Sequence, residues 1–185
     1  MIKRVVFVGI VAGVSALVFL TYSQVTRAQD SLMSEAHIER IRSNCTEAKA
    51  TLAQLHASDG LLRVNRGQVY DSISTKLMAP FNSRVSLSRL DATQLVSVAS
   101  AYERELTAFR TDYKAYEQQM SDILKVDCTK QPVAFYDAIA EAREKRLKVR
   151  QHVVALTKQI NEYKTAFGNF EKQYLSSLQS TQEEK

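Results

Sequence analysis

A long row of apolar residues between Leu90 and Ile123 constrains the fold of this chain more than any other feature. Successive members lie alternately four and three positions apart, so they fall on one side of an α-helix. Such a heptad seam is buried only when further helices pack along it. The row comprises Leu95, Ala99, Tyr102, Leu106, Phe109, Tyr113, Tyr116, Met120 and Ile123.

A second row of this kind precedes the first and predicts a helix over about residues 30–79. Asp59 and Gly60 interrupt it and leave open whether the helix kinks near residues 59–67 or breaks. Pro80 is expected to end the helix, because the residue before a proline avoids the helical conformation. The apolar row is Ile38, Ile41, Cys45, Ala48, Leu52, Leu55, Leu62, Val69, Ile73 and Leu77.

A third row comes after the first and predicts a helix over about residues 132–178. Residues 80–90 and 127–131 are expected to be connections, with Asp91 capping the helix that runs to about residue 126. Short connections make neighbouring helices antiparallel. The apolar row is Phe135, Ile139, Ala142, Val149, Val153, Leu156, Ile160, Tyr163, Phe167, Phe170 and Tyr174, with Arg146 as its one charged position.

These rows predict an all-α fold, an elongated antiparallel three-helix bundle of the coiled-coil type. The chain has only 5 Gly and 2 Pro and lacks Trp, which argues against a fold of sheets and turns. Because the third helix is about ten residues longer than the second, its end is expected to protrude past the tip of the hairpin that the first two helices form, with Phe167, Phe170 and Tyr174 as a candidate partner surface.

The N-terminal stretch from Val5 to Tyr22 contains no charged residue and is preceded by Lys3 and Arg4. As a helix it would be about 27 Å long, close to the thickness of a bilayer core. We expect a single-pass cell-membrane anchor over residues 5–22 with a cytoplasmic N-terminus and an extracytoplasmic body. The alternative is a signal peptide that is cleaved near Ala28, which would release the body as a secreted protein.

Cys45 and Cys128 are the only cysteines, and we expect them to form a disulfide. The point midway between them in the sequence lies inside the expected 80–90 connection, so antiparallel packing of the first two helices brings them to about the same level. The alternative is a pair of unrelated buried thiols, with Cys45 filling a seam position.

Two groups of arginines are the candidate binding residues. Arg143, Arg146 and Arg150 share a stripe and suit an anionic partner, or else they form a solvated face with Arg146 paired to Asp59 or Asp112. Arg63, Asn65 and Arg66 come after the interruption at Asp59 and Gly60, where an irregular helix would form a site.

The sequence contains no arrangement typical of an enzyme. No nucleophile–base pattern or phosphate-binding loop is present, and the scattered histidines give no metal-ligand spacing, so we expect no catalysis, metal or cofactor. Without Lys3, Arg4 and Arg27, the 25 basic residues fall to 22 against 20 acidic ones, which does not favour nucleic-acid binding.

Three segments carry a resemblance to a known group of proteins. They are RVNRGQ at 63–68, LMAPFNSR at 77–84 and CTKQPVAFYD at 128–137. Together they resemble uncharacterised single-pass helical envelope proteins of candidate-phyla, Saccharibacteria-like bacteria. The resemblance implies a bacterial envelope protein with an anchor and a helical body, and it implies no activity or site residues.

The sequence thus predicts an anchor or signal peptide over residues 1–28, a helical stalk over 29–44, a bundle over 45–179 and a polar tail over 180–185. We expect a structural or interaction module, an envelope scaffold or adaptor, with a protein or an envelope polymer as partner. A periplasmic-type holdase chaperone and a ligand-sensing bundle are the alternatives. The oligomeric state stays open.

Overall fold

The structure is a computed structural model that describes residues 33–183. Over this range the chain is helical and contains no strand, so the predicted all-α fold is confirmed. The elements are α2 (Glu35–Ser43), α3 (Cys45–Ser72), the π-helical η1 (Ile73–Met78), α4 (Ala79–Leu87), α5 (Thr93–Lys125) and α6 (Pro132–Glu183).

The predicted membrane segment at residues 5–22 and the cleavage site near Ala28 lie outside the described residues. Between residues 33 and 183, no helix combines the length and the apolar character that crossing a membrane requires. The chain divides into two units at Arg40 and Ile41. In the first unit, Ser34 caps α2, because its side-chain oxygen accepts a hydrogen bond from the backbone N–H of His37 at 3.4 Å.

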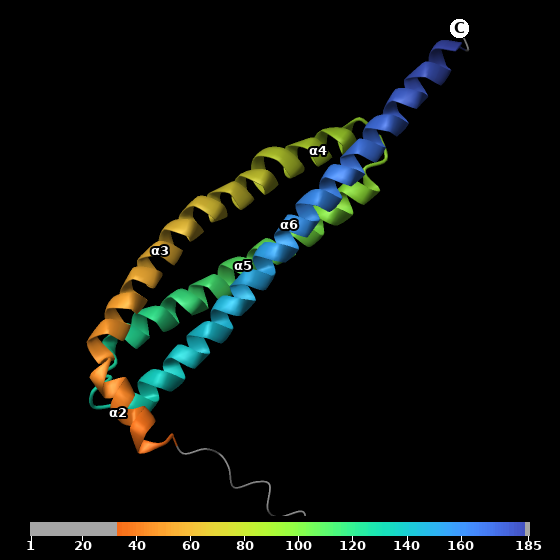
Figure 1. Cartoon of the computed structure of the whole chain (residues 1–185). Helices are drawn as coiled ribbons and strands as arrows, with labels where there is room; N and C mark the ends of the chain where they lie inside the picture. Colours follow the sequence, from red (N-terminus) through yellow and green to blue (C-terminus); the bar gives the residue numbers. More distant parts are fainter. Residues whose placement is uncertain (1–32, 184–185) are drawn as a thin grey trace, which may run out of the picture. The chain divides into compact units, whose positions relative to one another are not determined.

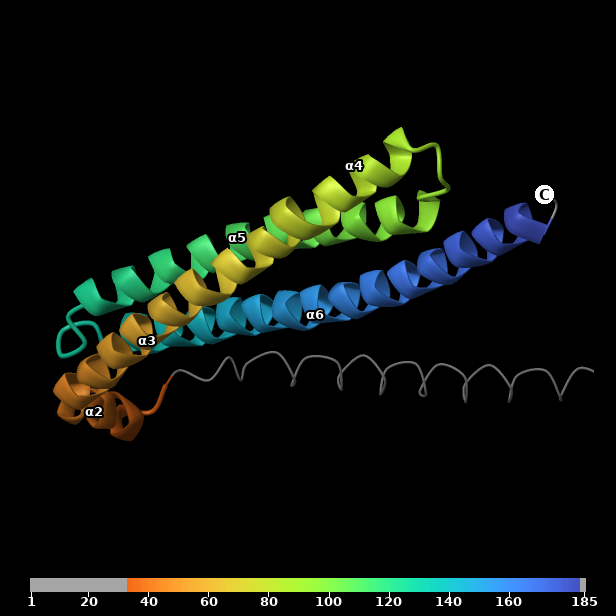
Figure 2. The ribbon, with the colours of Figure 1, turned by 90° about the horizontal axis from the view of Figure 1, so that it is seen from above.

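The second unit is a helical bundle, as predicted, with α5 as its shared helix (Figures 1 and 2). α6 runs beside α5, and the arm formed by α3, η1 and α4 contacts α5 with all three of its elements. The arm is antiparallel to α5: Asp59 meets Tyr113, and Asn82 meets Leu95 farther along. The predicted hairpin of the first two long helices is therefore present.

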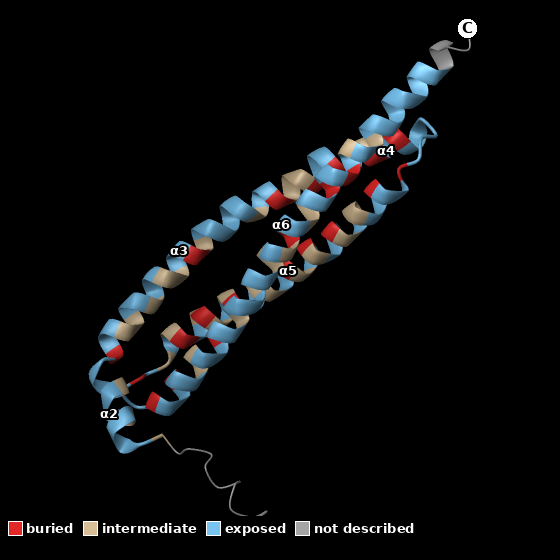
Figure 3. Cartoon of the chain, turned by 45° about the vertical axis from the view of Figure 1, so that its right-hand side comes forward, coloured by how far each residue is buried: buried red, intermediate tan, exposed pale blue. Residues whose placement is uncertain are grey.

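The apolar seam of α5 is buried along its whole length (Figure 3). Every predicted seam position except the half-buried Ala99 is at most 4% exposed. The alternating spacing predicted this face because the α3 arm and α6 both pack on the same side of α5. The α5 prediction is confirmed residue by residue.

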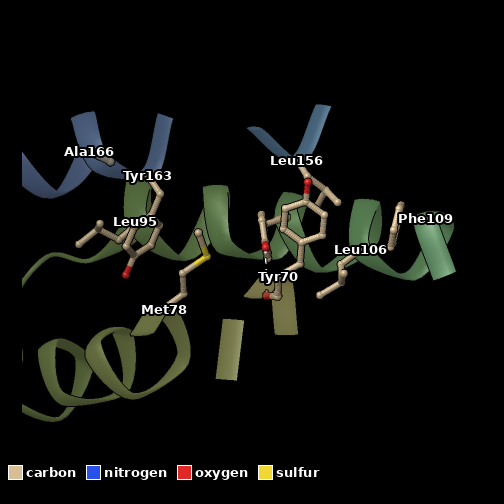
Figure 4. Close-up of a cluster of buried hydrophobic side chains, with 9 residues drawn as sticks. Tyr70, Met78, Leu95, Leu106, Phe109, Leu156, Tyr163 and Ala166 are labelled. Atoms are coloured by element: carbon tan, nitrogen blue, oxygen red, sulfur yellow. Dashed lines mark hydrogen bonds between the residues drawn. The ribbon is translucent and has the colours of Figure 1, made fainter. Parts of the chain in front are cut away.

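The bundle has two apolar cores rather than one. The core near the α4–α5 connection contains Tyr70, Leu106, Leu156 and Tyr163, and Figure 4 shows them gathered from α3, α5 and α6. The other core surrounds the disulfide. Val149 packs against both cores, so the boundary between them lies at its level.

α3 continues without a break through Asp59 and Gly60, so the first long helix is not interrupted there. Of the two alternatives for residues 59–67, the break is therefore wrong, and the kink stays a prediction. The apolar row predicted beyond it is wrong at Leu62, Val69 and Leu77, which are 48–56% exposed, whereas its fourth member, Ile73, packs against a core. The buried positions of this part are instead Asp59, Tyr70, Ser74, Met78 and Asn82.

Pro80 does not end the helix, contrary to expectation. The arm runs on as α4 to Leu87, because the preceding turns widen into the π-helix η1. There the N–H of Ala79 bonds to the carbonyl of Ser74, five residues back. This wider turn removes the clash between the proline ring and the carbonyl four residues before it, and proline needs no hydrogen-bond partner.

The real connection between the first two long helices is short, from Ser88 to Ala92. Arg89 takes a left-handed backbone conformation there, with φ of 57°. Asp91 accepts the N–H of Thr93 at 2.9 Å, and this hydrogen bond lowers the pKa of the Asp91 carboxyl. Asp91 therefore caps α5 from the residue before its formal N-cap, Ala92.

Cys45 and Cys128 form a disulfide with their Cα atoms 5.6 Å apart, as predicted. The bond joins the first residue of α3 to the loop between α5 and α6. Beside it, Lys49 Nζ donates to the carbonyl of Val126 at 3.1 Å. The bridge therefore closes the hairpin at the end opposite its connection.

The last turns of α6 extend beyond the α4–α5 connection (Figures 1 and 3). Phe167 and Phe170 do not stand free, because both rings pack on Phe81 of α4 at 5.0 and 5.8 Å. From Glu171 to Ser180 every residue is exposed, Tyr174 included. Of the predicted partner surface, Phe167 and Tyr174 are thus exposed to a similar degree, at 39% and 41%, and Phe170 is partly buried.

Reduction of the disulfide is expected to destabilise the bundle by about 4 kcal/mol, because the bond closes a loop with a sequence separation of 83 residues. Thermal unfolding with and without reductant measures the loss. The double variant C45S/C128S should unfold at the temperature of the reduced protein and ignore the reductant. An unchanged midpoint on reduction would contradict the expectation.

Candidate functional site

A cleft of about 440 Å³ opens between α3, α5 and α6, at the boundary between the two cores. Five arginines line it: Arg63, Arg66, Arg143, Arg146 and Arg150. We call it the arginine cleft. Its volume falls in the range of small-molecule sites.

Asp59 fixes the inner end of the arginine cleft. Its side chain is only 11% exposed, and Arg146 binds it with two hydrogen bonds, Nε to Oδ2 at 2.9 Å and Nη2 to Oδ1 at 3.0 Å. This paired geometry is the strong form of an arginine–carboxylate contact. It raises the pKa of Arg146 further. Arg146 thus occupies a seam position because a buried carboxylate across the bundle needs a cation.

Two tyrosines of α5 complete the polar contacts of Asp59. The hydroxyl of Tyr116 donates to Oδ2 at 2.7 Å, and that of Tyr113 donates to the Asp59 carbonyl at 3.1 Å. Burial, followed by the hydrogen bond to Asp59, raises the pKa of Tyr116 well above its usual value. Both hydroxyls are therefore neutral donors that already have acceptors, and the rings present their apolar faces.

The two arginine groups predicted separately from the sequence meet in this cleft. Arg63 and Arg66 come from α3, and Arg143, Arg146 and Arg150 come from α6. Asn65 does not join them and lies by a shallower hollow with Gln68 and Val69. The antiparallel register sets this meeting, since it places the middle of α3 opposite the first third of α6.

The arginines outnumber the acidic residues in the cleft by five to one, since Asp59 is the only carboxylate among the described residues that line it. Arg63 pairs with Glu117 at 3.0 Å and lies 4.8 Å from the ring centroid of Tyr113. Arg66, Arg143 and Arg150 are exposed and form no ion pair with any residue between 33 and 183. Three cations are therefore available to an anion.

Apolar side chains make up the rest of the arginine cleft. The rings of Phe109, Tyr113 and Tyr116 come from α5. Leu62 and Leu147 are 48% and 55% exposed, a high value for leucines that flank a cleft. The remaining apolar lining residues are Val149 and Val153 of α6.

A second charged group surrounds His152, farther along α6. It was not predicted from the sequence, because the histidines are scattered along the chain. His152 lies between two carboxylates of α5, with Nδ1 2.5 Å from Glu105 and Nε2 2.8 Å from Asp112. Burial alone would lower the pKa of His152, but hydrogen bonds to Asp112 and Glu105 outweigh it and leave the pKa raised. The signal was the spacing of the carboxylates, seven residues apart on one helix face.

The chemistry that this region offers is binding. Guanidinium groups bind phosphate, sulfate or carboxylate oxygens in a fork-like geometry, and aromatic and aliphatic faces take up apolar surface. Between residues 33 and 183, no group of three or more His, Cys, Asp or Glu residues is arranged to hold a metal ion. Outside the arginine cleft, Lys145 and Glu141 form an ion pair within α6, with Nζ 2.6 Å from Oε1.

Comparison with known proteins gives no match to a family model, to a curated protein or to a solved structure. The function of the chain is therefore inferred from the geometry of the bundle and from its sequence.

Replacement of Asp59 by alanine is expected to destabilise the protein by about 2–4 kcal/mol, because it leaves the buried Tyr116 hydroxyl without an acceptor and Arg146 without its counterion. Asp71 is a matched control on the same helix, since its pair with Arg110 is half-exposed and worth less than about 1 kcal/mol. Urea unfolding measures both. Equal losses would contradict a special role for Asp59.

The contribution of His152 is expected to depend on pH. Because the folded-state pKa is raised, the stabilisation is fully present below the unfolded pKa of about 6.5 and is lost as the pH rises through the folded value. The H152Q variant should therefore lose more stability at about pH 6 than at about pH 9, relative to the parent. H56Q on α3 is the control. Thermal melts across this range that stay parallel for H152Q and the parent would refute the assignment.

Proposed function

We propose that this chain is a membrane-anchored, extracytoplasmic helical module that acts by binding an anionic partner in the arginine cleft. One observation carries the proposal: three exposed arginines without an ion pair among the described residues, Arg66, Arg143 and Arg150, converge from two helices on one cleft. Arginines arranged only for solubility would be interspersed with carboxylates.

The anchor at residues 5–22 stays a prediction from the sequence and supplies the location in this proposal. The disulfide Cys45–Cys128 supports it, because disulfides persist mainly outside the cytosol. The envelope role that the sequence resemblance implies agrees with such a location. An envelope scaffold or adaptor would use the arginine cleft as its contact with a protein or polymer.

A ligand-sensing bundle is the second candidate function. It is favoured by the position of the cleft, which lies where α3, α5 and α6 all contribute side chains. A ligand held there would change how firmly the α3 arm is joined to α5 and α6. Asp59 and Arg146 already join the arm to α6 at this level.

A photo-crosslinking amino acid at Leu147, inside the arginine cleft, tests the proposed function in intact membranes carrying the full chain. We expect an adduct that disappears in the R66Q/R150Q background and persists in R84Q/R104Q. All four arginines are exposed, and both double variants remove two charges.

The same amino acid at Leu87, which is 81% exposed at the far end of α4, is the positional control. Adducts that form equally from both positions, or that survive R66Q/R150Q, would refute an anionic partner in the arginine cleft.

A further inference from the structure

We infer that the arginine cleft takes a single-tailed amphipathic anion, a phosphate or carboxylate group carried on an apolar chain. This inference rests on the proposed function and names the class of its partner. The cleft combines apolar surface with cations that form no ion pair within residues 33–183, and a ligand of this class matches both.

The arginines that would hold the anionic head come from both sides of the cleft. Arg66 belongs to α3, whereas Arg143 and Arg150 lie seven residues apart on α6, on the same helix face. Arg146 is engaged with Asp59 and Arg63 with Glu117, so the head group meets the other three. Each can offer two parallel N–H groups to a phosphate or a carboxylate.

The floor of the cleft suits an apolar tail because its polar atoms are already paired. The hydroxyls of Tyr113 and Tyr116 are both bound to Asp59, so the rings give the cleft carbon surface rather than donors. Val149 and Val153 continue this surface along α6. A ligand with hydroxyl groups along its length would lose hydrogen bonds to water here without replacement.

The flanks of the cleft add apolar area that the bundle does not use. Leu62 on α3 and Leu147 on α6 stay about half exposed, although both helices contribute other side chains to the two cores. A tail between these two leucines would remove both from water. A free inorganic anion would leave this surface exposed, and an uncharged chain would leave the arginines unpaired.

Isothermal titration of the full chain, kept in solution by a non-ionic amphipathic polymer, tests the inference. The probes are decyl phosphate below its micellar concentration, 1-decanol and inorganic phosphate. We expect decyl phosphate to bind at least about tenfold more tightly than either of the others. R66Q/R150Q should abolish this advantage, and R84Q/R104Q should keep it.

A pair of leucine variants separates the tail from the head. L62S should weaken decyl phosphate binding and leave inorganic phosphate unchanged, whereas L61S, the adjacent leucine outside the cleft, should change neither. Both leucines are exposed, so neither substitution opens a hole in a core.

The possible results separate the two proposals. Equal, arginine-dependent binding of decyl phosphate and inorganic phosphate would overturn the amphipathic ligand and leave the anionic partner standing. Equal binding of decyl phosphate and decanol, insensitive to R66Q/R150Q, would overturn both. A decyl phosphate advantage that is lost in R66Q/R150Q, and in L62S but not L61S, supports the inference.

Discussion

A carboxylate buried between helices must have its charge met, and Asp59 imposes that requirement on this bundle. Arg146 of α6 and Tyr116 of α5 both bind the Asp59 carboxylate, so one side chain of α3 joins three helices at one level. The polar layer also divides the apolar interior into two cores. Where the cores part, the helices leave the space that becomes the arginine cleft.

The fold could be predicted where one physical rule dominates. On α5, all partners press on one face, and the alternating spacing gave its buried residues correctly. On the α3 arm, two local features defeated the pattern. The buried face takes in Asp59 instead of an apolar residue, and from the π-helix onward the buried positions Ser74, Met78 and Asn82 follow one another at intervals of four residues. A π-helical turn has less favourable hydrogen-bond geometry than an α-helical turn, and no pattern of apolar residues marks its position in the sequence.

The candidate site could be predicted in its parts and not in its assembly. The stripe of Arg143, Arg146 and Arg150, and the pairing of Arg146 with Asp59 or Asp112, could be predicted from spacing. The meeting of Arg63 and Arg66 with them depends on how three helices register side by side. Asp112 pairs with His152 rather than with Arg146. The spacing alone could not decide between these two partners, because it does not show which residue of α6 lies level with Asp112.

The disulfide turns most of the bundle into a covalently closed ring. Residues 46–127 lie between its two cysteines, including the whole of α5 and the turn that joins it to α4. A protease that cuts once in the exposed connection at Ser88–Ala92 would therefore leave both fragments joined and both helices still packed. In an oxidising, protease-rich environment, the cleaved chain would therefore stay folded as one molecule. The two fragments would separate only after the disulfide is reduced.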